Sequence, residues 1–335
     1  MSGTFRPRLV NGRFGDPALF VGLAHEYQAV LFDLGDLSSL SARELLRIGT
    51  IGVSHMHIDH LIGFDAILRV NVGRDAKISI FGPAGLADRL GHKLQGYSWD
   101  LVDRYDTELV FEVSELVSRE QLNSWSFRFS RGFVPEPAGE AAAPGGLLIE
   151  TPGWRICARI LEHHGPCLGF AIEEPRRINV WRNRVEEMGL AVGPWLKELK
   201  DLVREGREDD TAVSLPDGSN MPLASLRHLV SITCGMKIGY ATDISDSEAN
   251  RDALRDLCGE ADILFIEAAF AARDAGLARA RAHLTTTAAG EIARECGARR
   301  VEPFHFSHRY EGEEDLRLLE VQTAFEQRPS EKGPR

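Results

Sequence analysis

Three histidines and a carboxylate lie within six consecutive residues: His55, His57, Asp59 and His60. Alternate residues of an extended segment point the same way, so His55 and His57 can present their imidazoles to one point. Asp59 and His60 follow where the chain turns into a helical pattern, and they can serve a second point nearby. Imidazole and carboxylate ligands without thiolate suit zinc, with manganese or iron as substitutes. The alternative is a histidine-rich surface loop, but 11 histidines spread at random over 335 residues would rarely produce this segment.

The elements expected to position this segment are short apolar strands, several of which end in polar residues. Asp243 closes one such strand, and a turn that carries His163 and His164 joins two others. Strand patterns cover residues 27–36, 76–83, 154–161, 168–173, 236–243 and 262–270, and helical spacing covers 61–68, 84–94, 288–296 and 312–328.

Two segments are expected to be mostly irregular. Residues 1–26 are rich in Gly, Pro and Arg, which predicts a lead-in without regular structure except for a short strand near 18–21. Residues 135–146 contain little apolar bulk and many Pro, Gly and Ala residues, which predicts an exposed loop.

The pattern H-x-H-x-D-H at residues 55–60 resembles the signature of the metallo-β-lactamase superfamily. Within that superfamily the sequence is most similar to the ribonuclease Z family, endonucleases that mature the 3′ ends of tRNA precursors. The likeness extends over roughly residues 28–310 and includes Phe-Asp-x-Gly at 32–35, Phe-Gly-Pro at 81–83 and His-Phe-Ser-x-Arg-Tyr at 305–310. Two features depart from the family pattern: a Gly-Thr-Gly opening is missing, and Thr-Asp-Ile at 242–244 stands in place of Gly-Asp-Thr.

The resemblance implies a fold of the α/β (α+β) class, namely the four-layer αββα sandwich with two mixed sheets face to face and helices outside. It implies a single domain over 1–335 with an inserted helical arm at 174–226. In the ribonuclease Z family such an arm, the exosite, grips the tRNA. Residues 176–207 carry eight Lys or Arg and two Trp, which suits phosphate binding, although acidic residues dilute the charge. The alternative is an ordinary helical cap over the active site.

The resemblance also assigns the metal ligands. It places His55, His57 and His163 on one divalent cation, Asp59, His60 and His305 on a second, and Asp243 between the two. Zinc is the metal favoured, with Mn²⁺ or Fe²⁺ as substitutes. His163 is the aligned histidine of its turn, counted back from Gly169-Phe170, and His164 is the alternative. Asp33 matches the aspartate that supports the metal loop, although it could also be a strand-end turn residue.

Two further residues match a catalytic pair that lies beside the metals in this family, Glu267 and His283. The implied nucleophile is hydroxide. Asp59 would orient it or accept the proton that water loses as hydroxide forms, while His283 would donate a proton to the leaving oxygen. Glu267 would hold His283 in the required tautomer and keep it protonated. The alternative is a buried core glutamate beside a histidine that precedes a helix.

Composition limits the environment in which the chain works. No apolar run approaches the about 20 residues of a membrane span, and the N-terminus lacks the apolar core of a signal peptide, so no membrane partner is expected. The five cysteines are scattered and show no C-x-x-C spacing, which predicts reduced thiols in the cytoplasm. The net charge of −11 argues against non-specific binding to nucleic acid through bulk charge, although a local basic patch could guide RNA.

These features together predict a metal-dependent phosphodiester hydrolase, a ribonuclease Z-like endonuclease that removes 3′ trailers from tRNA precursors through hydroxide activated by two zinc ions. The resemblance further implies a homodimer. An alternative enzyme would hydrolyse another ester, such as a cyclic nucleotide, a small phosphodiester or a lactone, because fold and metal centre are shared across many substrates. A non-catalytic RNA-binding or scaffold protein is the alternative of another class, and the filled ligand positions argue against it.

Overall fold

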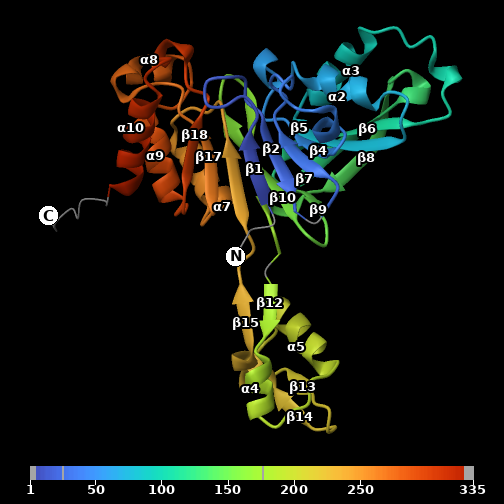
Figure 1. The fold of residues 1–335 in the computed structure, drawn as a ribbon, viewed down its shortest axis with the longest axis vertical. Coiled ribbons are helices and arrows are strands. Elements are labelled where there is room, and N and C mark those ends of the chain that lie inside the picture. The colour runs from blue at the N-terminus through green and yellow to red at the C-terminus, as the bar shows by residue number, and fades with distance from the viewer. Residues whose placement is uncertain (1–4, 25, 176, 328–335) are drawn as a thin grey trace. The chain divides into compact units, whose positions relative to one another are not determined.

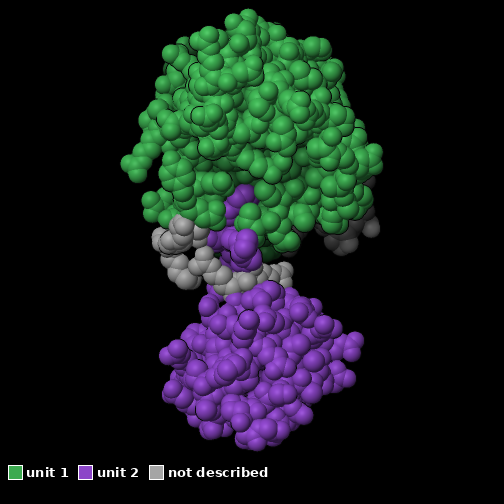
Figure 2. Space-filling model, turned by 90° about the vertical axis from the view of Figure 1, so that its right-hand side faces the viewer, with its two compact units in different colours: residues 1–151, 155–173, 236–335 green, residues 152–154, 174–235 purple. Residues whose placement is uncertain are grey.

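The computed structural model describes residues 5–24, 26–175 and 177–327. Its internal contacts divide the chain into two compact units, coloured separately in Figure 2. Unit 1 contains residues 1–151, 155–173 and 236–335, and unit 2 contains residues 152–154 and 174–235.

The first sheet of unit 1 has eight strands that follow one another in chain order. Its central strands run parallel and the strands at both edges run antiparallel, so the sheet is mixed. The strands are β1 (Phe5–Leu9), β2 (Leu19–Leu23), β3 (Ala29–Phe32), β4 (Ile48–Gly52), β5 (Ala76–Pro83), β6 (Leu109–Ser118), β7 (Gln121–Arg128) and β8 (Pro135–Ala142).

The second sheet has six strands in the order β18-β17-β16-β11-β10-β9. β16, β17 and β18 run parallel to one another and the other neighbours run antiparallel. The strands are β9 (Leu147–Glu150), β10 (Arg155–Glu162), β11 (Pro166–Glu173), β16 (Lys237–Ala241), β17 (Ile263–Glu267) and β18 (Val301–Phe304).

Aromatic rings join the two sheets. Phe32 on β3 of the first sheet stacks on Phe170 and Tyr240 of the second, with ring centroids 5.2 and 5.6 Å apart. Tyr240 in turn stacks on Phe304 at 5.2 Å. All four side chains are fully buried, and burial of such large apolar surfaces dominates core energetics.

Helices cover the outer face of each sheet (Figure 1). The helices beside the first sheet are α1 (Ala42–Leu45), α2 (Phe64–Asn71) and α3 (Leu86–Gln95), and those beside the second are α7 (Glu248–Cys258), α8 (Ala275–Ala280), α9 (Thr286–Glu295) and α10 (Glu314–Glu326). Side chains cap several of them, as Thr285 does for α9 and Ser247 for α7. The layers are therefore helix, sheet, sheet, helix, and the predicted αββα sandwich is confirmed.

Unit 2 has a small core of its own. Two short antiparallel pairs flank its helices: β12 (Arg177–Val180) pairs with β15 (Val230–Thr233), and β13 (Ala212–Ser214) pairs with β14 (Asn220–Pro222). The helices are α4 (Arg182–Glu187), α5 (Trp195–Arg204) and α6 (Leu223–Leu226). The unit extends to Gly235 because β15 returns beside β12. Its likeness to an RNA-gripping arm stays a prediction, and Arg176 lies outside the described residues.

Two expectations about irregular segments were wrong. The lead-in forms β1, which pairs with β2 from Phe5 to Leu9, and residues 135–142 form the edge strand β8. The segment 135–142 is mostly exposed, as expected, but it is extended and paired. Proline is tolerated there because an edge strand needs ladder hydrogen bonds on one side only. Among the described residues, no helix combines the length and apolar character needed to cross a membrane.

Candidate metal centre

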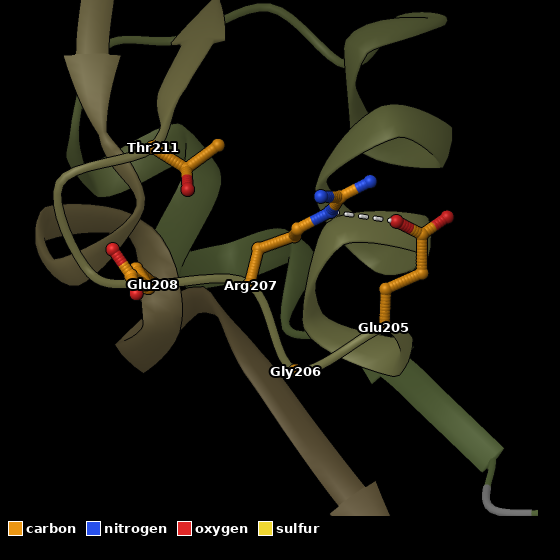
Figure 3. Close-up of a pocket in the computed structure, with 5 residues that line it drawn as sticks. All are labelled: Glu205, Gly206, Arg207, Glu208 and Thr211. Carbon is orange, nitrogen blue, oxygen red and sulfur yellow. Dashed lines mark hydrogen bonds and ion pairs between the residues drawn. The ribbon is translucent and has the colours of Figure 1, made fainter.

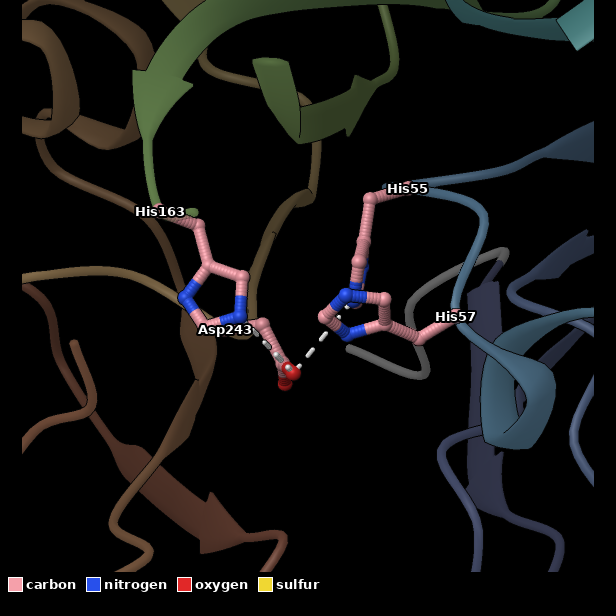
Figure 4. Close-up of side chains that lie close together, drawn as sticks. All are labelled: His55, His57, His163 and Asp243. Atoms are coloured by element: carbon pink, nitrogen blue, oxygen red, sulfur yellow. Dashed lines mark ion pairs between the residues drawn. The ribbon is translucent and has the colours of Figure 1, made fainter. Parts of the chain in front are cut away.

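The predicted ligands come together at one edge of unit 1, although they are spread over 250 residues of sequence. The loop after β4 supplies the histidine-rich segment, the β10–β11 turn supplies His163, and the ends of β16 and β18 supply Asp243 and His305. Figure 4 shows His55, His57, His163 and Asp243 pointing toward one another from three separate segments. The carboxyl ends of the parallel strands β16 and β18 meet at the same sheet edge, which is where α/β folds gather functional side chains.

Among the described residues, three groups of side chains each offer ligand atoms that lie within 4.8 Å of one another. All seven predicted ligands belong to at least one group, whereas His164 belongs to none. His164 is exposed, and its ring lies beside that of His163, with centroids 4.5 Å apart. The groups are His55, His57, His163 and Asp243; Asp59, His60 and His305; and Asp243, Glu267, His283 and His305.

Asp243 lies between the first two groups and directs one carboxylate oxygen to each. Its Oδ2 is 3.4 Å from His55 Nε2 and 3.8 Å from His163 Nε2. Its Oδ1 is 3.5 Å from His60 Nε2 and 3.0 Å from His305 Nδ1. A carboxylate in this position can be shared by two cations.

Three of the nitrogens that face Asp243 lack hydrogen-bond partners among the described residues. His55 Nε2, His60 Nε2 and His305 Nδ1 are buried without one, and a buried unsatisfied polar atom costs about 1–3 kcal/mol. The opposite nitrogens are engaged, since His60 Nδ1 donates to Asp33 at 3.0 Å and His163 Nδ1 donates to the Ala282 carbonyl at 2.9 Å. Metal-bound histidines are oriented in this way. The site therefore fits divalent cations.

In the protein without metal, neighbouring charged residues of the site shift one another's pKa values. Burial opposes protonation of His305, but Asp243 and Asp59 outweigh it and raise the pKa of His305 to about 10. Burial, helped by neighbouring histidines, lowers the pKa of His55 to about 2. Burial would raise the pKa of Asp243, yet His305 and His60 hold it well below its usual range. A cation must displace the proton on His305, so metal affinity should rise with pH.

Asp33 is the centre of a buried hydrogen-bond network beneath the metal loop. Its Oδ1 accepts from the backbone N–H of Ser54 at 2.6 Å. Its Oδ2 accepts from Ser54 Oγ at 2.8 Å, from His60 Nδ1 at 3.0 Å and from the Tyr240 hydroxyl at 2.8 Å. The structure thus places Asp33 in contact with the loop and with His60, which favours the supporting role over a simple turn residue. Tyr240 belongs to this network, and its role was missed from the sequence because a strand tyrosine is an ordinary core residue.

Close backbone packing fixes the same loop from the other side. The backbone N–H of Leu34 donates to the His60 carbonyl at 2.9 Å, and that of Gly63 donates to the Leu34 carbonyl at 2.8 Å. A Cβ at Gly63 would lie 2.1 Å from the carbonyl oxygen of Gly35, so only glycine allows this approach.

Removal of the Tyr240 hydroxyl tests the network. We expect Tyr240→Phe to weaken metal affinity by about 10- to 100-fold, because Asp33 loses a donor and orients His60 less firmly. Competition with a chromogenic zinc chelator measures the affinity. Tyr310→Phe is the matched control, since it removes another buried tyrosine hydroxyl, which donates to Asp274 away from the loop. Equal affinities in Tyr240→Phe and wild type would contradict the expectation.

Several residues at the site have left-handed backbone conformations. Asp33, Asp243, Ala282 and His305 have φ values of 60, 52, 53 and 58°, four of the six non-glycine residues with positive φ in the described chain. Such conformations cost free energy in L-residues, and they concentrate where function fixes the direction of a side chain.

Comparisons with known proteins place the chain in a family. No model of a protein family matches the sequence. A ribonuclease Z of Deinococcus radiodurans is 34% identical over 287 residues, which is 84% of this chain and 83% of that protein. The chain belongs to the ribonuclease Z family. A ribonuclease Z of Microcystis aeruginosa is 30% identical over 84% of this chain and 76% of that protein. The zinc phosphodiesterase ELAC protein 1 of Mus musculus is 27% identical over 87% of this chain and 81% of that protein.

Solved structures agree on the fold of this ribonuclease Z family member. The metallo-β-lactamase fold protein YhfI of Bacillus subtilis superposes with a TM-score of 0.54 at 17% identity, covering 95% of this chain and 92% of that one. The short form of human tRNase Z gives a TM-score of 0.53 at 21% identity, covering 92% of this chain and 93% of that one. As a ribonuclease Z family member the chain is a metal-dependent hydrolase of phosphodiesters that binds divalent metal.

The third group contains the predicted catalytic pair of this ribonuclease Z family protein. His283 Nδ1 donates to Glu267 Oε2 at 2.9 Å, and Glu267 Oε1 accepts from the backbone N–H of Ile244 at 2.7 Å. Glu267 is fully buried. Unlike His55, His60 and His305, these two residues satisfy each other, which favours a catalytic role over a further metal site.

His283 of this pair lines a cavity of about 360 Å³ in unit 1, whereas Glu267 is buried behind it. Asp59 and His305 line the cavity together with His283, and so do nine other residues, of which Phe306, Ser307 and His308 belong to the motif at 305–310. Those residues are Phe14, Gly15, Asp16, Ala269, Phe270, Arg281, Phe306, Ser307 and His308.

A separate hollow of about 550 Å³ lies in unit 2 of the ribonuclease Z family chain (Figure 3). Its lining residues are Glu205, Gly206, Arg207, Glu208 and Thr211, and Arg207 Nε pairs with Glu205 at 2.8 Å. It contains none of the candidate ligands and no histidine, so the chemistry belongs to the cavity in unit 1.

Proposed function

We propose that this ribonuclease Z family member removes 3′ trailers from tRNA precursors with two divalent cations, and that the native metal is zinc. The observation that carries the proposal is the position of Asp243, which directs one oxygen to each of two histidine groups. The name of the mouse relative, a zinc phosphodiesterase, supports the choice of metal. The described cysteines are all unpaired, which supports a cytoplasmic location.

The proposed first cation is held by His55, His57 and His163, and the second by Asp59, His60 and His305, with Asp243 shared. Cations at these positions would polarise the phosphodiester and acidify water, which supplies a nucleophile at neutral pH. Side chains of the protein would orient the attacking water and transfer the protons.

Asp59 is proposed to orient the attacking water and accept its proton. It lines the cavity, and its Oδ2 is 3.5 Å from His305 Nε2 and 3.4 Å from His60 Nε2. Burial would raise the pKa of Asp59, but those two imidazoles hold it well below its usual range. The carboxylate is therefore ionised and can act as a hydrogen-bond acceptor.

His283 is proposed to donate a proton to the leaving oxygen. Its Nδ1 is occupied by Glu267, which leaves Nε2 as the donor. Burial lowers the pKa of His283, but the charge and hydrogen bond of Glu267 outweigh burial and raise it above its ordinary value. A raised pKa keeps the imidazolium populated near neutral pH, where a general acid must be protonated.

The pKa of His283 yields a pH prediction. A general acid works below its pKa, so activity should fall as pH rises through the pKa of His283. Glu267→Gln removes the charge that raises this pKa, and we expect the basic limb of the kcat profile to move down by about 1 pH unit or more. Initial rates on precursor tRNA from pH 5 to 10 measure the shift. An unmoved basic limb would show that another group controls it.

Unit 2 is proposed to contact RNA as the family's arm, but through few cations. Arg207 and Arg227 pair with Glu205 and Asp209, and Arg204 pairs with Asp201. Arg182, Lys197 and Lys200 form no ion pair with a described residue, so they are the candidate phosphate contacts. We also propose a homodimer in which the arm of one subunit serves the site of the other, which analytical ultracentrifugation tests.

Cleavage of a precursor tRNA tests the proposed function. Zinc-loaded protein should cut a precursor with a 3′ trailer immediately after the discriminator base, and a chelator should abolish the cut until zinc is restored. Hydrolysis of bis(p-nitrophenyl) phosphate by the same preparation shows whether the centre is active. Turnover of the small ester without any tRNA product would overturn the tRNA assignment and leave the hydrolase assignment intact.

A further inference from the structure

An arginine and an aspartate that line the cavity in unit 1 form no ion pair with each other. Arg281 and Asp16 both line it, and neither side chain forms a hydrogen bond or ion pair with a described residue. Arg251 of the same unit, by contrast, pairs with Asp246, Glu291 and Glu295. An unpaired cation beside catalytic side chains is free to bind an anion.

The backbone holds Arg281 in place beside the catalytic histidine. The N–H of Arg281 donates to the carbonyls of Leu277 and Ala278 at the end of α8, at 3.1 and 3.2 Å. Ala282 then turns the chain with a φ of 53°, and the N–H of His283 returns to the Ala278 carbonyl at 3.0 Å. The same tight turn therefore fixes the positions from which Arg281 and His283 reach the cavity.

Asp16 adds a carboxylate to the lining of the cavity, as Asp59 does. It follows Phe14, whose ring packs edge-on against Phe306 at 5.4 Å and so fixes the β1–β2 turn to the segment after β18. A carboxylate repels phosphate, whereas the guanidinium of Arg281 attracts it and can bind two of its oxygens.

We propose that Arg281 binds the phosphate next to the scissile one and so makes the cavity selective for polynucleotides over small phosphodiesters. The inference rests on the proposed function, because it places a polynucleotide in the cavity. A small phosphodiester has no second phosphate and gains nothing from Arg281. A substrate with two linkages gains a charge-assisted hydrogen bond.

A double-mutant cycle that combines a substitution in the protein with a change in the oligonucleotide tests the proposal. Trinucleotides are used as competitive inhibitors of bis(p-nitrophenyl) phosphate hydrolysis, and each variant's own KM corrects the inhibition constant. A neutral methylphosphonate replaces one of the two linkages, on either side in turn. We expect Arg281→Gln and the methylphosphonate each to weaken binding about 10-fold, and the two together to weaken it no more than either alone.

Arg279→Gln is the matched control. Arg279 is exposed on α8, two residues away, and does not line the cavity. Arg279→Gln changes the net charge of the protein by the same amount as Arg281→Gln. Arg281→Lys should keep most of the binding. The slope of the logarithm of the inhibition constant against that of salt concentration should fall by about 0.7 in Arg281→Gln and remain unchanged in Arg279→Gln.

The outcomes separate the inference from the proposed function. Additive effects of Arg281→Gln and the methylphosphonate, or equal losses in Arg279→Gln and Arg281→Gln, would overturn the role of Arg281. The inhibition assay requires only an active phosphodiesterase. A protein that fails on precursor tRNA but shows the non-additive pattern would refute the tRNA assignment and retain the phosphate contact.

Discussion

Replacing Asp243 with asparagine is expected to lower kcat/KM for phosphodiesters on the order of 10³-fold. Removal of one partner from a buried group of interacting charges costs about 3–5 kcal/mol, and each 1.36 kcal/mol corresponds to about a factor of ten in rate. Asp243 is buried, and its two oxygens face the two histidine groups. Asparagine keeps the shape but presents one oxygen and an NH₂ donor, so one group faces no acceptor. Metal content by mass spectrometry and initial rates with bis(p-nitrophenyl) phosphate measure both consequences.

Asp246→Asn is the matched control for this substitution. Asp246 is three residues further along, exposed, and paired with Arg251 at 2.7 Å. Such surface pairs contribute about 0–1 kcal/mol, so this variant should keep wild-type metal content and rate. An Asp243→Asn protein with full metal content and full activity would remove the basis for a shared carboxylate.

The ligand set could be predicted because its signals are local. His55, His57 and His60 stand within six residues, and Asp243 and His305 each follow a short apolar strand. Once those strands run parallel in one sheet, with only β17 between them, their carboxyl ends lie at the same edge. The structure brings all seven residues together, and their role as ligands stays a prediction that metal analysis tests.

The support beneath the ligands could not be predicted in the same way. Tyr240 lies 207 residues from Asp33 in sequence, and their hydrogen bond exists only because the two sheets pack face to face. The left-handed conformations of Asp243 and His305 likewise have no signal in residue type, because tertiary contacts impose them against local preference.

The errors in the fold have a related cause. The segment 135–142 contains two prolines and small residues, which locally favour a loop. It becomes a strand because β7 offers an unpaired edge, with Phe127 opposite Pro135 and Trp125 opposite Pro137. Arg281 and Asp16 were missed because they carry no motif. Only the cavity that they share with His283 makes them candidates.

Replacing His283 with alanine is expected to lower kcat for precursor tRNA by about 10²- to 10⁴-fold while metal content remains that of wild type. His283 is held by Glu267, which in turn accepts the backbone N–H of Ile244, so the ring is positioned by the protein without a cation. Removal of the imidazole therefore takes away a proton donor and leaves His55, His57, His60, His163 and His305 in place. Single-turnover rates at saturating enzyme measure the loss.

The leaving group provides the control for His283→Ala. An RNA alkoxide needs a proton as it departs, whereas p-nitrophenolate is stabilised by its own ring and needs little help. The loss in His283→Ala should therefore be much smaller with bis(p-nitrophenyl) phosphate than with precursor tRNA. Equal losses on both substrates, together with reduced metal content, would identify His283 as a metal ligand, in line with its membership of the group formed with Asp243, Glu267 and His305. Unequal losses at full metal content identify it as the general acid, because only a proton donor distinguishes the two leaving groups.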